Sequence, residues 1–173
     1  MPLSLYDVSI ASYQQVLDAT AAILEKGAEH ADGGGIDLAE IVETRLREDM
    51  APFRFQVVSV WHHSHGAVAG IRAGNFAPPP DLGELDYAAL QALVAEARET
   101  VRGVAREEMD ELEGRPLLFK AGGFELPFSV ENFILSFSLP NFYFHATTTY
   151  AILRMAGVPL GKLDFLGNMR LDA

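Results

Sequence analysis

The side chains of this sequence whose types and spacing could do chemistry are five histidines. A neutral imidazole can take up a proton or bind a divalent metal ion near neutral pH. His145 is the most informative, because on a helix expected over 141–156 it falls within the apolar stripe. A histidine that faces a protein interior must be hydrogen-bonded or act as a ligand. Asn141 lies one turn earlier on the edge of that stripe, so the pair has the i, i+4 spacing of a two-ligand metal clip.

Three further histidines occur together, in the segment Trp61-His-His-Ser-His. At about 100° per residue of an α-helix, His62 is expected to point toward water, and His63 and His65 lie on opposite edges of the apolar stripe. Gln56 shares the edge of His63. His62 and His65 are close enough in sequence to hold one metal ion between them. The alternative is that all three are ordinary surface or boundary histidines, as is expected of the solvated His30 at a helix end.

Two interpretations of His145 remain open at this stage. In the first, it lies at the floor of a pocket between the second and last long helices, as a general base or metal ligand. Gln56, Asn141 and Tyr150 would then orient a substrate or water molecule. In the second, Gln56, Asn141 and His145 form a hydrogen-bonded polar network in a non-catalytic protein. Its function would be interaction or small-molecule sensing, as a homodimer that associates through an exposed helix face.

Long helices must position these residues, and apolar side chains at spacings of three and four predict four of them, over 5–29, 52–73, 86–110 and 130–156. The last is expected to be interrupted at Leu139-Pro140. Asp37 is a suitable cap for a short helix over 38–45. The sequence therefore predicts one all-α domain, residues 1–173, built as a four-helix bundle.

A change of period between the third and fourth helices predicts a β-hairpin. Residues 116–121 and 124–128 read as two short strands around Gly122-Gly123, where glycine permits the positive φ of a tight turn. Two strands alone are marginally stable, so the hairpin must lean on the helices. The tail, 162–173, is expected to be extended.

Composition excludes several classes of function. A formal net charge of -11 opposes binding to nucleic acid and to anionic membranes. The absence of cysteine rules out disulfides, a thiolate nucleophile and a cysteine zinc site. The N-terminus has no signal-peptide pattern, and no apolar run is long enough for a membrane helix, so a cytoplasmic location is expected. P-loop, G-x-S-x-G and dinucleotide glycine motifs are missing.

Segments spread over nearly the whole chain resemble a bacterial family of unknown function. The most specific is 139–145, LPNFYFH, and it is supported by 157–165 (GVPLGKLDF), 5–7 (LYD) and 49–57 (DMAPFRFQV). That family is similar to the DinB/YfiT-like superfamily of four-helix bundles. The superfamily includes metal-dependent enzymes, among them thiol-dependent transferases and a maleylpyruvate isomerase branch.

The resemblance implies a site for a divalent metal such as zinc or nickel. In the superfamily, three histidines hold the metal, one on the second helix and two in an H-x-x-x-H on the last. His145 matches the second histidine of that pair, but Asn141 replaces the first and Gln56 stands at the second-helix position. His63, two turns beyond Gln56, is the candidate replacement. Catalytic zinc needs three protein ligands, so the resemblance supports the fold more strongly than a metalloenzyme.

Overall fold

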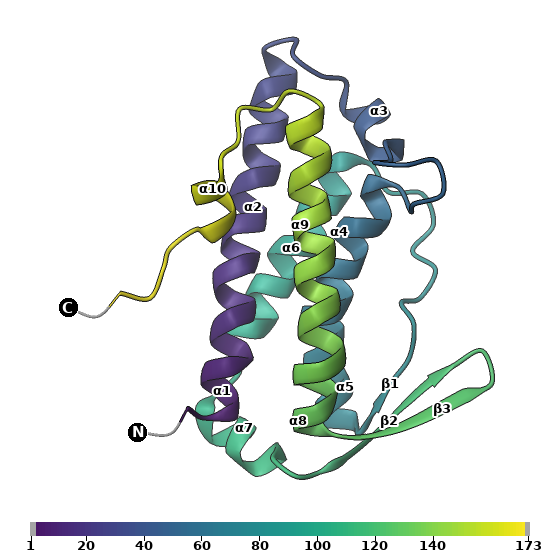
Figure 1. Cartoon of the computed structure of the whole chain (residues 1–173), viewed down its shortest axis with the longest axis vertical. Helices are drawn as coiled ribbons and strands as arrows, with labels where there is room; N and C mark the ends of the chain where they lie inside the picture. The colour runs from purple at the N-terminus through teal and green to yellow at the C-terminus, as the bar shows by residue number, and fades with distance from the viewer. Residues whose placement is uncertain (1–2, 172–173) are drawn as a thin grey trace.

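The computed structural model describes residues 3–171 of the chain, which fold into a mostly helical domain with a small three-stranded sheet (Figure 1). The helical elements are α1 (Leu5–Val8), α2 (Ile10–Asp32), α3 (Leu38–Glu43), α4 (Phe53–Trp61), η1 (His62–Gly66), α5 (Ala67–Ala73), α6 (Tyr87–Arg102), α7 (Arg106–Leu112), α8 (Val130–Phe133), η2 (Ile134–Ser138), α9 (Leu139–Met155) and α10 (Lys162–Leu166). The strands are β1 (Asn75–Phe76), β2 (Pro116–Ala121) and β3 (Phe124–Ser129).

Four long helices enclose the core. α2 packs against α6 and α9, and α4 packs against the same two helices, so each of the four has two neighbours (Figure 1). The apolar stripes face inward and bury large side chains completely, among them Tyr13, Phe53, Leu90, Phe133 and Phe142. Each fully buried side chain of this size contributes about 1.5–3 kcal/mol to folding. Within residues 3–171, no helix has both the length and the apolar character needed to cross a membrane.

Two of the expected helices are each divided in the structure. The expected helix over 5–29 breaks at Ser9, whose buried hydroxyl donates to the carbonyl of Leu5. The one expected over 86–110 ends at Arg102 and resumes at Arg106 as α7. Gly103 follows α6 directly, and glycine has the highest cost in a helix after proline.

The expected interruption at Leu139-Pro140 is wrong, because the helix runs continuously from α8 through η2 to α9. Pro140 has no backbone N–H, and the preceding turn is π-helical, with wider i→i+5 bonding. The Asn141 side chain donates through Nδ2 to the carbonyl of Phe137, at 2.7 Å. The chain therefore accommodates the proline with a wider turn and a side-chain hydrogen bond.

The predicted hairpin is confirmed, and it belongs to a larger sheet than expected. β2 and β3 pair antiparallel around Gly122 and Gly123, which have φ of 54° and 89°. A short third strand, β1, pairs parallel to β2 and places Phe76 opposite Phe119. Phe76 also packs against Phe133 of α8, with ring centroids 4.9 Å apart. This aromatic contact braces the hairpin against the helices.

The tail is not extended as expected, because α10 forms and packs against α2. Asp164 accepts from the backbone N–H of Gly161 at the start of α10 and pairs with Lys26 of α2 at 2.6 Å. These contacts fix the helix at both its end and its side. Residues 172 and 173 of the predicted tail lie outside the described residues.

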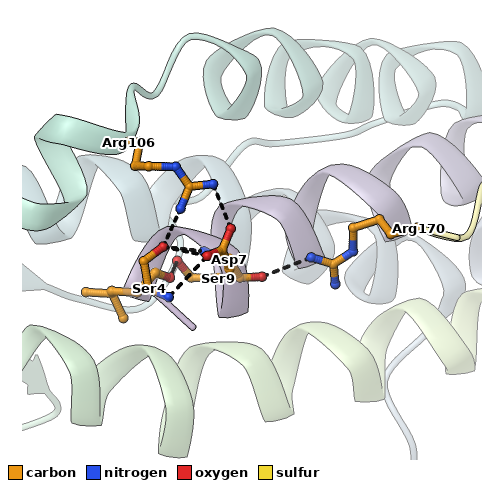
Figure 2. A network of polar contacts seen from close by, with 6 residues as sticks. Ser4, Asp7, Ser9, Arg106 and Arg170 are labelled. Carbon is orange, nitrogen blue, oxygen red and sulfur yellow. Dashed lines mark hydrogen bonds and ion pairs between the residues drawn. The ribbon is translucent and has the colours of Figure 1, made fainter. Parts of the chain in front are cut away.

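A polar network joins α1 to two distant parts of the chain (Figure 2). Asp7 closes a capping box with Ser4 and accepts from Arg106 of α7 at 2.7 Å. Its backbone carbonyl accepts from Arg170 at 3.0 Å. The hydrogen bond from Arg106 holds the pKa of Asp7 far below its usual value. The first helix is thus fixed to α7 and to the C-terminal segment.

Candidate functional site

His145 lies on the side of α9 that faces α4, and a hydrogen-bonded relay sets its tautomer. Its Nδ1 lies 2.8 Å from Oε1 of Gln56, a buried residue in the first turn of α4. Gln56 in turn donates through Nε2 to the carbonyl of Ala51, at 2.9 Å. Because the amide nitrogen is committed to Ala51, the amide oxygen faces His145, and Nδ1 of His145 must carry the proton. Nε2 of His145 therefore keeps its lone pair.

His63 is the second imidazole of the site. Its ring is nearly parallel to that of His145, with an interplanar angle of 11° and centroids 6.1 Å apart. The side chain is only 8% exposed, and its Nδ1 is buried without a hydrogen-bond partner among the described residues. A buried polar atom without a partner costs about 1–3 kcal/mol. Nδ1 of His63 is therefore a buried polar atom that no other group of the described residues satisfies.

The backbone beneath His63 is held rigidly by buried hydroxyl groups. Ser138 of η2 donates to the carbonyl of His63 at 2.8 Å, and Tyr13 of α2 donates to Ser138 at 2.7 Å. His63 itself lies in η1, so the π-helical turns of two neighbouring helices meet at this point. π-helical turns occur frequently at functional sites.

Both imidazoles are poor bases in this environment. Burial lowers the pKa of His145 to about 4. The pKa of His63 falls to about 3, chiefly through burial and then through the neighbouring His62 and His145. Both side chains are therefore neutral at pH 7. An efficient general base has a pKa near the working pH, so these rings are better suited to accept hydrogen bonds than to abstract protons.

Aromatic side chains surround the pair. The rings of Phe55 and Phe144 stand edge-on to His145, with centroids 5.8 and 5.2 Å away. Phe55 is 43% exposed and Phe144 is 56% exposed. The ring of Phe137 lies against that of His63, with centroids 5.6 Å apart. The site thus runs from a buried imidazole, through a half-buried one, to exposed aromatic rings at the surface.

The remaining predicted site residues lie at different distances from this centre. The structure brings His145, Gln56 and His63 together, and Asn141 lies one turn before His145 with its amide nitrogen bonded to Phe137. Tyr150 lies apart, since its ring packs against Phe165 of α10, with centroids 6.1 Å apart. Phe55 and Phe144 were missed by the sequence analysis. Each directly precedes a predicted site residue, but an exposed phenylalanine alone indicates no chemistry.

His62 and His65 do not share a site. The expectation that His62 points to water is wrong, because it is buried, donates through Nε2 to the carbonyl of Ala77 at 2.7 Å, and stacks on Phe76. The π-helical turn η1 is wider than the α-helix assumed for the prediction, so side-chain directions are shifted there. His65 stacks on Trp61 and has its Nδ1 2.9 Å from the hydroxyl of Thr100.

His30 lies in the last turn of α2 and is half-buried. Its ring lies directly against Gly35, where an added Cβ would come within 2.2 Å of Nε2. A larger residue at position 35 would therefore require the imidazole ring to move.

The residues at the site do not fit a divalent metal ion. The amide oxygen of Gln56 is hydrogen-bonded to His145, and its amide nitrogen is hydrogen-bonded to Ala51. The amide nitrogen of Asn141 is hydrogen-bonded to Phe137. The remaining donors are neutral, and no carboxylate joins them. Across residues 3–171, no three His, Cys, Asp or Glu side chains are grouped so that they could hold a metal ion. The three-ligand set implied by the resemblance is therefore not reproduced.

Two surface hollows border α4, the helix that carries Gln56, and neither includes His145. The larger, about 860 Å³, is bordered by α3, the start of α6 and Arg54. The smaller, about 290 Å³, is lined by Phe55, Val58 and a loop segment that contains Pro79, Pro80 and Leu82. Phe55 both lines the smaller hollow and contacts His145. It is therefore the link between that hollow and the imidazole pair.

Comparison with known proteins agrees with this architecture. A crystal structure described as a DinB family member protein from Shewanella denitrificans is similar to the chain, with a TM-score of 0.80 and 26% sequence identity over 98% of this chain and 95% of the other. None of the curated proteins matches. The model of a family described as a domain of unknown function, DUF1993, matches residues 5–166. The chain belongs to the DUF1993 family, and its fold is DinB-like.

Proposed function

We propose that this protein is a DinB/YfiT-like four-helix bundle that binds a small molecule at His145 without a metal ion. The observation that carries the proposal is the relay Ala51–Gln56–His145, which leaves Nε2 of a neutral imidazole as a fixed hydrogen-bond acceptor. The lowered pKa of His145, about 4, keeps that acceptor unprotonated throughout the physiological range.

The surroundings favour a particular kind of ligand. Phe55 and Phe144 both contact the imidazole with their rings and are both partly exposed at the surface. Ligand sites are usually apolar, with a few fixed polar groups that set orientation. A flat apolar molecule with one hydrogen-bond donor, such as a hydroxyl or an N–H, fits this combination. The hollow of about 290 Å³ beside Phe55 has room for its remainder.

A metal-dependent transferase or hydrolase that uses His145 is the competing hypothesis. It would need His63 and Asn141 to complete the coordination of zinc or nickel. An Asn amide is a weak ligand for such ions. The other ring nitrogen of a metal-bound histidine usually donates to a carboxylate or carbonyl, which makes the histidine a stronger ligand. Gln56 supplies the carbonyl but no charge, which is why we favour the metal-free proposal.

Phenol is a suitable probe, because it combines an aromatic ring with a single donor. Titration of phenol into labelled protein, followed by NMR of the histidine rings, should shift the His145 signals in a saturable way. His145→Ala should abolish saturable binding, and His65→Ala, which removes another ring-stacked histidine, should leave it intact. Absence of saturation in the wild type would contradict the proposal.

Metal content is measured on the same preparations, purified without a chelator. The proposal expects no stoichiometric metal in the wild type or in His145→Ala. About one equivalent of zinc, nickel or iron in the wild type, lost in His145→Ala, would instead establish the metalloenzyme hypothesis.

A further inference from the structure

The two imidazoles of the site have the same orientation. His63 of η1 and His145 of α9 have nearly parallel rings, at 11°, with centroids 6.1 Å apart. In both rings Nδ1 is the inner nitrogen, since that of His145 faces the buried Gln56 and that of His63 is itself buried. Neither Nε2 atom has a hydrogen-bond partner among the described residues, and neither is enclosed by them. Both Nε2 atoms are therefore free to contact a bound molecule.

The surroundings of His63 decide where its proton lies. Burial lowers its pKa to about 3, so at pH 7 the ring is neutral and has one N–H and one lone pair. Its Nδ1 has no partner, and the rings of Phe76 and Phe137 pack against the imidazole. A proton on Nδ1 would be a buried N–H without an acceptor, which folded proteins avoid more strictly than an unpaired acceptor. The structure therefore favours a proton on Nε2, where it can be donated.

We propose that His63 and His145 are held in opposite tautomers, and that together they recognise a molecule with a hydrogen-bond donor and an acceptor side by side. The Nε2 lone pair of His145 accepts from the donor, because Gln56 keeps the proton of that ring on Nδ1. The Nε2–H of His63 donates to the acceptor. A cyclic lactam has this pattern, since its N–H and C=O point to the same side of the ring. This ligand class rests on the proposed function and specifies it.

The charge of the site favours a neutral ligand over an ionised one. Both imidazoles are uncharged at pH 7, because burial holds the pKa of each well below 7. A carboxylate offers two acceptors and no donor, and the net charge of -11 on the chain repels it. An ammonium group offers donors and no acceptor, so it would leave the Nε2–H of His63 unpaired. A neutral lactam satisfies both rings, and a flat one fits beside Phe55 and Phe144.

Nitrogen NMR of the histidine rings tests the tautomers in the free wild-type protein. The protonated and unprotonated nitrogens of a neutral imidazole resonate at well-separated shifts, so each ring reports which nitrogen carries the proton. We expect a proton on Nδ1 of His145 and on Nε2 of His63 at pH 7. The signals are assigned by their loss in His145→Ala and in His63→Leu. A proton on Nδ1 of His63 would overturn the inference, whatever the protein binds.

Binding of 2-pyridone, a flat lactam, tests the contact made by His63. His63→Leu should weaken the affinity for 2-pyridone roughly tenfold, the effect of one lost hydrogen bond. The affinity for phenol should stay the same, because phenol donates to His145 and needs no donor from His63. N-methyl-2-pyridone, which has no N–H, should bind the wild type roughly tenfold more weakly than 2-pyridone. His65→Leu, at a histidine outside the site, is the matched control and should change none of these affinities.

The two probes separate the failure of the ligand class from the failure of the proposed function. If phenol binds the wild type and His63→Leu weakens neither probe, or weakens both equally, the donor role of His63 is overturned and the proposed function stands. If neither probe binds the wild type in a saturable way, the proposed function fails and the ligand class fails with it. An unchanged circular dichroism spectrum of His63→Leu, together with its retained phenol binding, shows that the variant is folded.

Discussion

Acid should destabilise this protein well above the pH at which carboxylates protonate, because its buried histidines resist protonation. The pKa of His145 is about 4 and that of His63 is about 3 in the folded state, both depressed by burial from an ordinary value of 6.5. Unfolded chains bind a proton on each ring as the pH falls through 6.5, and the folded protein does not. The stabilisation is therefore complete above pH 6.5 and is lost progressively as the pH falls toward 4.

The magnitude follows from the number of protons involved. Each histidine that is protonated only in the unfolded state lowers the free energy of unfolding by up to about 1.4 kcal/mol per pH unit. Between pH 6.5 and 4.5, His63 should contribute about 2 kcal/mol. His145 is partly exposed, so solvent screening reduces its share to about 1 kcal/mol. His62, whose pKa is also lowered by burial, acts in the same direction.

Chemical denaturation at pH 7.5, 6.5, 5.5 and 4.5 measures this loss. His63→Leu removes one of the titrating rings together with its unpaired Nδ1, so the decrease between pH 6.5 and 4.5 should shrink by about 2 kcal/mol. Ile71→Val, a packing change of about 1 kcal/mol at a buried position, should lower the whole curve and leave its slope unchanged. Asp7 does not interfere, because its stabilisation is lost only below its ordinary pKa of 3.8.

Two outcomes would refute this reasoning. If the wild-type free energy of unfolding stays constant from pH 7.5 to 4.5, the rings take up protons in the folded state. If His63→Leu keeps the full wild-type slope, the loss comes from other groups, and His63 is not the principal buried base.

Two further changes test individual contacts. Gln56→Glu should place a carboxylate beside Nδ1 of His145 and raise the pKa of that ring by roughly 1–3 units, which NMR titration measures. An unchanged pKa would show that the residue at position 56 does not act on the imidazole. Asn168→Asp, at an exposed position near the C-terminus, serves as the control. Ser138→Ala should lower the free energy of unfolding by about 1–3 kcal/mol, as measured by chemical denaturation, because it leaves the buried hydroxyl of Tyr13 without its acceptor. In a Tyr13→Phe background, the same Ser138→Ala change should lower the free energy of unfolding by clearly less.

The sequence was a good guide to the helices because their apolar stripes are long and regular. The stripe around Ile23 and Leu24 of α2 predicts a helix, and those residues are fully or nearly fully buried. The hairpin followed from its paired glycines. The two-residue strand β1 was not predictable, since Asn75 and Phe76 are too few to show an alternation and their partner lies in β2.

The histidine cluster shows where local pattern reasoning fails. The prediction for His62 assumed the regular rotation of an α-helix, and η1 is a π-helical turn. At this turn Ser138 of η2 reaches the carbonyl of His63, a contact between segments far apart in the sequence that no local pattern predicts. The proximity of Gln56, His63 and His145 was indicated only through the shared edge of the helix and through the family resemblance.

The residue that accepts the hydrogen bond from Nδ1 of His145 is an amide, Gln56, and not a carboxylate. A carboxylate there would accept the same hydrogen bond from Nδ1 and would also stabilise a protonated or metal-bound imidazole. Gln56 instead has a fixed orientation, because its Nε2 is held by Ala51. It therefore sets the tautomer of His145 without adding charge. A ring held in this way is suited to accept a hydrogen bond from a neutral donor, as the proposed ligand requires.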